Sequence, residues 1–579
     1  MIKDFFRKLT RRWDLPYSHK IKTLINSFSL TEKVIFYFLS VVLLLSGITL
    51  LFQVNKFFLV EVPDYGGTLT EGVVGSPRFI NPLLATSDID RDLTSLVYSG
   101  LLKMDFAGNF IPDVAEKYEI SEDGLEYTVT LKDDVYFHDG VKLTADDVIF
   151  TVEKAQDPNL KSPRSGNWEG IKVHKVDEKT LVFVLRQQYS PFINNLTLGI
   201  LPKHIWKNAS IEEIPFSQFN TKPIGAGPYK LEDISYAGSG LPNEYRFKSY
   251  AKYSLGKAYI TNLVIKSFSN EGDLIKAYKS GDIESMHSIS PKQLPELEIN
   301  KEDIILSPLP RIFGVFFNQN IAPVFVNKEV RVALDMATDK KAIIDSILGG
   351  YGKEIDGPIP TTSIESAPLK SEEERIKDAE EHLTKNGWEK NSDGIFQKKG
   401  KSGSTLLSFS ISTGDAPELK ETAILLQKQW QKLGALVEVK IFEIGDLNQN
   451  IIKTRKYDSL LFGEIIGRDS DLYPFWHSAA RISPGLNIAM YTNIKADRIL
   501  ENIRKTTSVS EQKKLLNDLN QEIKNDTPAV FTYSPYFVYI VPDKVHNARI
   551  GALTYPGERF NDISTWYIET NNVWKIFRN

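Results

Sequence analysis

Residues 67–153 read GTLTEGVVGSPRFINPLLATSDIDRDLTSLVYSGLLKMDFAGNFIPDVAEKYEISEDGLEYTVTLKDDVYFHDGVKLTADDVIFTVE, and they indicate the fold more clearly than any other stretch. Within them, apolar and polar residues alternate over 125–131, which predicts a strand with one buried face. Asp139 and Gly140 then provide the positive-φ residue that a tight turn favours. No catalytic constellation appears here, so these residues predict a scaffold.

A helix is predicted directly after this turn. Thr144, with Asp147 three residues later, resembles the start of a capped helix, although a capping box normally has Glu or Gln at the second position. The residues that follow place Val148, Ile149 and Val152 on one apolar face.

The order of short motifs over this stretch resembles the extracytoplasmic solute-binding proteins of peptide ABC importers, the oligopeptide- and dipeptide-binding family (family 5). The motifs are, in chain order, Asn81-Pro82, 98–102 (YSGLL), 112–116 (PDVAE), 125–131, 137–140 (FHDG) and 144–148 (TADDV). Two further matches are 223–231 (PIGAGPYKL) and 330–340 (VRVALDMATDK). In the first of these, the glycines are expected to adopt backbone angles that other residues refuse.

The resemblance covers nearly all of residues 62–579. It implies an α/β, two-lobed, periplasmic-binding-protein-like fold (type II, cluster C) with an extra subdomain. Lobe 1 is expected over 62–310, with the extra subdomain at about 88–210. Lobe 2 is expected over 311–530, and residues 531–579 are expected to return to lobe 1.

The local pattern of the expected lobe 2 agrees with an α/β domain. Apolar helical faces that end at glycine are followed by an alternating strand, which predicts a mainly parallel sheet with covered faces. Helix N-termini are predicted at Asn327, Asp339, Ser371 and Ser508.

Residues 34–54 carry no charge and consist mainly of Val, Ile, Leu and Phe. At ~1.5 Å per residue, this run just spans a hydrocarbon layer of about 30 Å. No small-residue cleavage site follows it, so we expect an uncleaved transmembrane signal-anchor helix. Lys and Arg exceed Asp and Glu over residues 1–33, which predicts a cytoplasmic N-terminus and an extracellular or periplasmic main domain. The alternative is a helix buried in the core.

The sequence contains no cysteine. Most members of the family in bacteria with a cell wall carry a lipid on an N-terminal cysteine, so here the helix is expected to provide the anchor instead. Disulfides, thiol catalysis and cysteine metal sites are excluded as well.

Composition and motifs favour a binding protein over an enzyme. The net charge is −4 and no basic block follows the N-terminal arm, so we expect no binding of nucleic acid. None of the histidines has metal-ligand spacing, and the H-E-x-x-H and G-x-S-x-G motifs do not occur. Pro228 follows Gly225 and Gly227 where a nucleotide-binding loop would open a helix. We therefore expect no metal, no cofactor and no catalysis.

The resemblance implies that an extended peptide lies between the lobes and that a carboxylate of lobe 2 pairs with its N-terminal ammonium. Asp469 and Asp471 are the candidates for this carboxylate; the alternative is that they cap a turn or the next short helix. Tyr473 and Trp476 are expected to form a pocket wall.

The remaining candidates are assigned by position and by chemistry. Gly75 and Ser76 are expected where the first strand meets the ligand, with an ordinary turn as the alternative. A guanidinium fork matches a ligand carboxylate, and surface charge is the alternative for each arginine; a tyrosine facing the cleft has core packing as its alternative. These side chains are Arg311, Arg468, Arg481, Tyr533 and Tyr536.

We interpret the chain as a monomeric, membrane-anchored binding protein that captures oligopeptides and delivers them to an ABC permease. ATP hydrolysis is then left to the ATPase subunits of that partner, because the sequence has no P-loop. Three alternatives stay open. The same fold can bind a nickel chelate, haem or an oligosaccharide; the chain can be a peptide sensor without transport; or it can be a membrane-anchored hydrolase.

Overall fold

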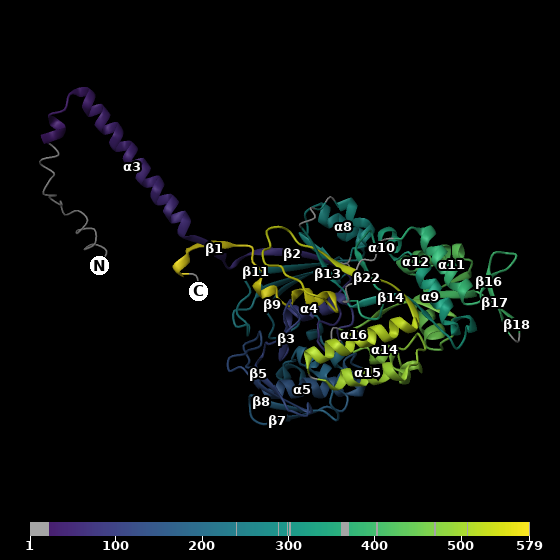
Figure 1. Ribbon diagram of the computed structural model, residues 1–579. Coiled ribbons are helices and arrows are strands. Elements are labelled where there is room, and N and C mark those ends of the chain that lie inside the picture. The colour runs from purple at the N-terminus through teal and green to yellow at the C-terminus, as the bar shows by residue number, and fades with distance from the viewer. Residues whose placement is uncertain are drawn as a thin grey trace. The chain divides into compact units, whose positions relative to one another are not determined.

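The computed structural model describes residues 23–577 apart from 239, 288, 298, 300–302, 361–369, 401–402, 468–470 and 507 (Figure 1). The chain forms two compact units. One comprises the residues up to Asp64 together with those from Thr570 onward, and the other comprises Tyr65–Glu569.

The smaller unit contains the predicted transmembrane segment. Residues 34–54 lie inside α3 (Leu30–Phe58), which begins with a capping box between Ser29 and Glu32. It is the one helix of the described residues that is long and apolar enough to cross a membrane. None of its residues is buried, so the alternative of a core helix is wrong.

The chain's C-terminal strand pairs with the strand that follows this helix. β1 (Leu59–Pro63) and β23 (Thr570–Trp574) are antiparallel. Trp574 donates a hydrogen bond from Nε1 to Asn55 Oδ1 (2.9 Å), and its ring stacks on Phe58. The C-terminal segment is thereby attached to the last turn of α3.

The larger unit is built on a sheet of twelve described strands. Its main path is β20-β19-β21-β14-β22-β12-β2-β11-β10-β9, and β13 and β15 also pair with β22. The strands are β2 (Gly66–Val74), β9 (Tyr229–Tyr236), β10 (Pro242–Ser249), β11 (Ile260–Phe268), β12 (Ser285–His287), β13 (Ile304–Pro308), β14 (Arg311–Phe317), β15 (Gly352–Glu354), β19 (Ser408–Gly414), β20 (Leu436–Phe442), β21 (Ser459–Ile465) and β22 (Ala529–Ile540).

The part of this sheet that lies in the expected lobe 2 is mixed, so the prediction of a mainly parallel sheet is wrong. β19 runs parallel to β20 and β21, but β14 is antiparallel to both β21 and β22. The apolar run of β14 is almost entirely buried. Because a strand buried on both faces needs apolar residues in either direction, its sequence does not encode the direction of its neighbours.

Four strands form a separate small sheet in the order β5-β6-β8-β7. They are β5 (Ala115–Ile120), β6 (Glu126–Leu131), β7 (Lys172–Lys175) and β8 (Thr180–Val184). The predicted alternation over 125–131 is confirmed, because Tyr127, Val129 and Leu131 are buried. The predicted helix start is confirmed too, since the Asp147 carboxylate accepts the Thr144 N–H at 2.9 Å before α5 (Ala145–Gln156).

Helices pack against the large sheet both in the expected lobe 1 and in the expected lobe 2 (Figure 1). The longer ones are α4 (Asp88–Val97), α8 (Glu271–Lys279), α9 (Lys328–Ala337), α10 (Lys340–Ile347), α11 (Glu372–Lys385), α12 (Pro417–Leu433), α15 (Ile494–Lys505) and α16 (Val509–Asp526). The predicted N-caps Asp339, Ser371 and Ser508 accept hydrogen bonds from their helices. Asn327 occupies the N-cap position of α9 without such a bond.

The buried apolar side chains of the large unit form separate clusters, and the chain passes from one cluster to another at two places. Leu309 belongs to the cluster that contains β2 and α4, whereas Ile312 belongs to a cluster of the expected lobe 2. Tyr533 belongs to another cluster of the expected lobe 2, whereas Phe537 belongs again to the cluster that contains β2 and α4. Residues 309–312 and 533–537 therefore connect separate cores.

Candidate functional site

A cavity of about 330 Å³ lies where distant segments meet. Its wall comes from α4, from the loops next to the small sheet, from residues 554–561, and from Gly467 after β21. The lining residues include Arg91, Thr94, Tyr98, Lys103, Asp113, Arg164, Thr554, Tyr555 and Glu558.

Helix α4 presents one face to this cavity and buries the other. Ser87 caps it by accepting the Asp90 N–H, and Leu93 and Leu96 are fully buried. Arg91, Thr94 and Tyr98 follow at spacings of three and four residues, so their side chains share the cavity face. The helical period of the sequence thereby determines which polar groups line the wall.

The end of α4 also explains the glycines of 223–231. Neither Gly225 nor Gly227 has positive φ, so the expected role in backbone angles is wrong. A Cβ on Gly225 would lie 2.1 Å from Val97 O, and one on Gly227 would lie 2.5 Å from Val97 C. The Gly227 N–H donates to Val97 O at 2.8 Å, so both glycines serve close backbone packing.

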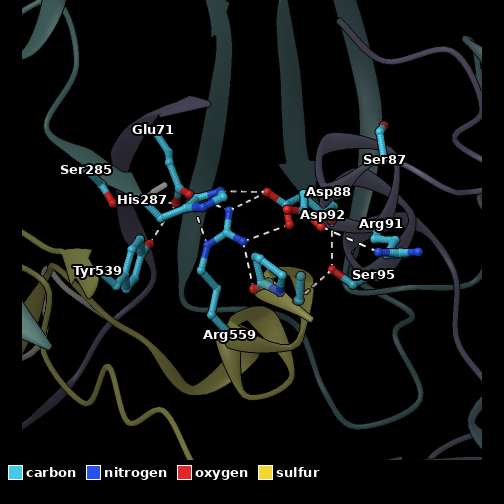
Figure 2. A network of polar contacts seen from close by, with 12 residues as sticks. Glu71, Ser87, Asp88, Arg91, Asp92, Ser95, Ser285, His287, Tyr539 and Arg559 are labelled. Carbon is cyan, nitrogen blue, oxygen red and sulfur yellow. Dashed lines mark hydrogen bonds and ion pairs between the residues drawn. The ribbon is translucent and has the colours of Figure 1, made fainter. Parts of the chain in front are cut away.

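A buried ionic network connects residues 554–561, which line the cavity, to the large sheet (Figure 2). Arg559, in η10 (Pro556–Phe560), donates to Glu71 Oε1 at 3.0 Å and to both oxygens of Asp92 at 2.8 Å. His287 Nε2 lies 2.9 Å from Asp92, and Tyr539 donates to Glu71 at 2.7 Å. These side chains join η10 to β2, α4, β12 and β22.

The charges of this network are balanced by direct contact. Burial alone would raise the pKa of Asp92, but Arg559 and His287 hold it well below its usual range. All four side chains around Arg559 are at most 2% exposed. Charges this deeply buried persist only when they are paired and hydrogen-bonded, so the network is a rigid support for the cavity wall.

Two predicted site residues, Asp471 and Tyr473, both contact Arg504. Arg504 Nε lies 2.9 Å from Asp471 Oδ1, and its Nη2 lies 2.7 Å from Oδ2. The same guanidinium lies 3.8 Å from the centre of the Tyr473 ring. Although burial opposes it, Asp471 raises the pKa of Arg504. Asp471 thus already has a cationic partner, and its role at a ligand ammonium stays a prediction.

Asp471 also accepts hydrogen bonds from other groups. It accepts the Tyr473 N–H at 3.3 Å at the start of α14 (Tyr473–Trp476), as its alternative role in capping predicts. It also accepts the Tyr189 hydroxyl at 3.3 Å. Tyr189 directly precedes η2 (Ser190–Thr197), whose Ser190 hydroxyl donates to Ile503 O at 3.4 Å. The loops of the small sheet therefore contact the expected lobe 2 here.

Two aromatic residues that were predicted to line the ligand cleft lie in the core instead. Trp476 is fully buried against Phe316, Tyr491 and Phe531, so its expected place in a pocket wall is wrong. Tyr533 is also buried and stacks on Phe313 at 4.9 Å, as the alternative of core packing predicts.

The remaining candidates have other surroundings in the described part of the chain. Gly75 has a φ of 108° at the end of β2 and donates its N–H to Phe268 O, which fits the alternative of a turn. Ser76 is exposed, and neither residue lines the cavity. Arg481 donates to Ser478 O at 2.9 Å. Arg468 and Asp469 lie outside the described residues, so their predicted roles are left open.

A model of the bacterial extracellular solute-binding proteins, family 5 (middle), matches residues 109–481. The chain belongs to this family.

Individual relatives agree with the family-5 assignment along most of their length. The oligopeptide-binding protein AppA of Bacillus subtilis is 28% identical over 87% of this chain and 92% of its own. Its structure in complex with a nonapeptide covers 88% of this chain and all of that one at a TM-score of 0.65. NikZ of Campylobacter jejuni, solved with Ni(L-His), is 28% identical and covers 86% of this chain and 99% of its own at a TM-score of 0.66.

Sequence reasoning missed the cavity residues Arg91, Arg164 and Tyr555 of this family-5 protein. For Arg91 a signal existed, because Arg91, Thr94 and Tyr98 have helical spacing within the stretch that carries the family motifs. Arg164 and Tyr555 lie in segments nearly 400 residues apart without a periodic pattern. Only the fold brings them together.

Proposed function

We propose that this chain captures oligopeptides between two lobes and delivers them to the permease of an ABC importer. The observation that carries the proposal is the family-5 match together with a cavity whose wall includes both a large first-lobe surface and Gly467. The relative AppA, named as an oligopeptide-binding protein and solved with a nonapeptide, supports peptide as the ligand.

The two lobes are joined by residues 309–312 and 533–537, where the chain passes between separate cores. The Ser534 hydroxyl donates to Leu309 O at 2.9 Å, so the two connections are coupled side by side. Short paired connections of this kind suit a hinge, and a ligand that contacts both lobes favours the closed state. On this proposal lobe 1 comprises about 62–310 with the returning residues 531–579, and lobe 2 comprises 311–530.

A direct experiment identifies what the chain carries. The full chain is purified in detergent micelles, its bound material is released with acid, and the extract is analysed by mass spectrometry. We expect peptides. Recovery of a nickel chelate, as in the structure of NikZ, or of haem or sugars without peptide would contradict the proposal.

The ammonium partner is proposed to be Asp469 or Asp471. A desolvated ammonium needs a charged partner, so Asp469→Asn or Asp471→Asn should weaken binding of a recovered peptide by about tenfold or more. Calorimetry of each variant is compared with the N-acetylated form of the same peptide on the unchanged chain. Equal affinity in both variants and for both peptides would exclude an ammonium site in this loop.

We further propose that α3 crosses the membrane, with residues 1–33 in the cytoplasm and the rest outside. The unburied apolar helix supports a membrane-spanning segment, and the excess of Lys and Arg over residues 1–33 supports this orientation. Protease added to intact cells should digest the large unit and spare the N-terminal segment. Release of the chain by an alkaline carbonate wash would argue against a spanning helix. We also expect a monomer without catalytic activity, which light scattering and an assay for peptide cleavage test.

A further inference from the structure

Exposed aromatic side chains gather at the C-terminal end of α3. Phe57 is 71% exposed, Phe58 is 42% exposed, and Trp574 of β23 is 46% exposed. The Trp574 ring stacks on Phe58 with the ring centres 6.2 Å apart, and Phe58 meets Phe57 edge-on at 5.5 Å. Ile576, in η12 (Lys575–Phe577), is 74% exposed. Two segments far apart in the sequence therefore place exposed apolar side chains at one end of the helix.

Two lysines accompany these apolar side chains. Lys56 and Lys575 are both exposed, and Lys575 Nζ lies 4.9 Å from the centre of the Phe57 ring. Among the described residues, neither ammonium group has an acidic side chain within 4.0 Å. Glu61 of β1 instead accepts the Thr570 hydroxyl at 2.5 Å. Both positive charges are therefore available to an external anion.

The position of these residues along α3 matches the edge of a bilayer. Residues 55–58 of the helix follow the uncharged run 34–54. They extend about 6 Å beyond that run at ~1.5 Å per residue. The polar headgroup region on each side of the hydrocarbon core is about 5–7 Å thick. When the uncharged run spans the core, the end of α3 and the Trp574 ring that stacks on it therefore lie at headgroup depth.

The ribbon of β1 and β23 becomes more polar with distance from the helix. The two pairs next to α3 contain only apolar side chains, and every later pair contains a polar one. In order from the helix, the pairs are Leu59 with Trp574, Val60 with Val573, Glu61 with Asn572, Val62 with Asn571, and Pro63 with Thr570. At ~3.4 Å per residue, the apolar part spans about 7 Å. This gradient fits a ribbon that leaves the headgroup region and enters water.

A lipid interface accounts for both the exposed rings and the lysines. Trp574 uses its N–H for Asn55, yet nearly half of its surface stays exposed. Removing such rings from water is favourable, and packing within the smaller unit does not achieve it. At a membrane interface, aromatic rings lie at headgroup level while lysine side chains extend towards the phosphates. One partner thus satisfies both kinds of group.

We propose that Trp574, Lys575 and Ile576 bind the lipid headgroup region of the outer leaflet beside the end of α3. β23 is then a second point of attachment to the membrane. Because β1 leads into the larger unit and β23 leads out of it, both connections of that unit start at the lipid surface. The inference rests on the proposed membrane crossing of α3. A protein partner is the alternative occupant, and vesicles without other proteins distinguish the two.

Single cysteines test this contact cleanly, because the sequence contains no other cysteine. The full chain carries a polarity-sensitive fluorescent maleimide at Ile576→Cys or at Asn572→Cys, an exposed residue of the same strand. Each labelled chain is reconstituted into vesicles of phosphatidylcholine and phosphatidylglycerol. We expect a blue shift of the emission at 576, and a loss of fluorescence with lipids that carry a nitroxide near the headgroup. The label at 572 should show neither. Equal emission and quenching at both positions overturn the proposal.

A third label separates this contact from the membrane crossing. Leu45→Cys places the label inside the uncharged run of α3, where a nitroxide deep in the acyl chain should quench it. If the label at 45 is quenched and the label at 576 is not, the crossing stands and the proposal of interfacial binding is wrong. If the label at 45 is not quenched, the crossing fails, and the label at 576 still decides whether β23 binds lipid.

Variants of the chain labelled at 576 identify the group that binds. Trp574→Ser should abolish the blue shift and the quenching. Trp574→Phe keeps an aromatic ring but loses the hydrogen bond to Asn55, and it should retain most of both effects. Phe216→Ser is the control, because it removes an aromatic side chain of the larger unit that is 89% exposed; it should change nothing. Undiminished quenching in Trp574→Ser, or equal loss in Trp574→Ser and Trp574→Phe, overturns the proposal.

Discussion

His138 shows how one side chain can connect two motifs that lie far apart in the sequence. Its Nε2 lies 3.0 Å from Gly227 O, and its Nδ1 lies 3.4 Å from Gly225 N, which can only donate. Nδ1 is therefore the acceptor, and the neutral imidazole donates from Nε2. Burial lowers the pKa of His138 to about 4. The folded state thus excludes the proton that an unfolded histidine binds below its ordinary pKa.

This exclusion predicts a pH dependence of stability. His138 contributes fully above the unfolded pKa of about 6.5, and the contribution is lost as the pH falls towards the folded pKa. Between pH 7 and pH 5, the free energy of unfolding should fall by about 2 kcal/mol more in the unchanged chain than in His138→Gln. Urea denaturation of both chains at the two pH values measures this difference. If the free energy of unfolding falls by the same amount in both chains, His138 is not the group that causes this pH dependence.

Arg559 illustrates the opposite case, a charge that is stable in the core because of its partners. Replacing it with Met keeps most of the volume but leaves Glu71 and Asp92 buried without their cation. We expect Arg559→Met to lower the free energy of unfolding by about 3–5 kcal/mol. The exposed control Arg246→Met should stay within about 0.5 kcal/mol. A loss below about 1 kcal/mol at Arg559 would show that the network contributes little to stability.

At the scale of elements, the end of α4 packs directly against the backbone of residues 223–231, within the apolar cluster that contains β2 and α4. A Cβ on Gly227 would lie 2.5 Å from Val97 C and 2.7 Å from Leu96 O. Backbone atoms have little freedom to move, so Gly227→Ala should destabilise the chain by about 1–3 kcal/mol. Gly238→Ala is the matched control, because nothing lies within 4 Å of its Cβ and its φ is not positive. Equal denaturation midpoints for the two variants would refute this packing role.

The same glycines show what could be predicted from the sequence. The strand over 125–131, the cap before α5 and the helix over the uncharged run 34–54 all depend on neighbours within a few residues, and each was confirmed as a local structure. The role of Gly227 depends on a helix 130 residues earlier, and local patterns carry no information about it. The mixed sheet around β14 was missed for a related reason, because a fully buried strand has no polar face that marks its neighbours.

Candidate site residues follow the same rule. Asp471 and Tyr473, two of the candidates, lie together because they are two residues apart at the start of α14. Arg91, Arg164 and Tyr555 meet only through tertiary contacts. Trp476 was assigned to a pocket by its chemistry, but a large apolar ring inside a lobe is stabilised more by complete burial than by exposure at a cleft.

At the scale of the whole larger unit, the contact of Tyr189 with Asp471 bears on lobe closure. Tyr189 belongs to the first lobe proposed above, and Asp471 belongs to the second. The Arg504 guanidinium also lies 5.7 Å from the Tyr189 ring. A hydrogen bond made only when the lobes are closed stabilises the closed state alone, so its loss should shift the population towards the open state.

Tyr189→Phe removes this hydroxyl and keeps the ring. A hydrogen bond to a charged group contributes about 1.5–3 kcal/mol, so a bound peptide should dissociate about tenfold faster or more. The association rate should change little, because the open state that first meets the peptide lacks this bond. Surface-immobilised full chain, with a peptide recovered from its own preparation, measures both rates. Tyr236→Phe is the control, since Tyr236 is an exposed residue of β9. Unchanged dissociation in Tyr189→Phe would mean that this contact has no part in holding the lobes closed.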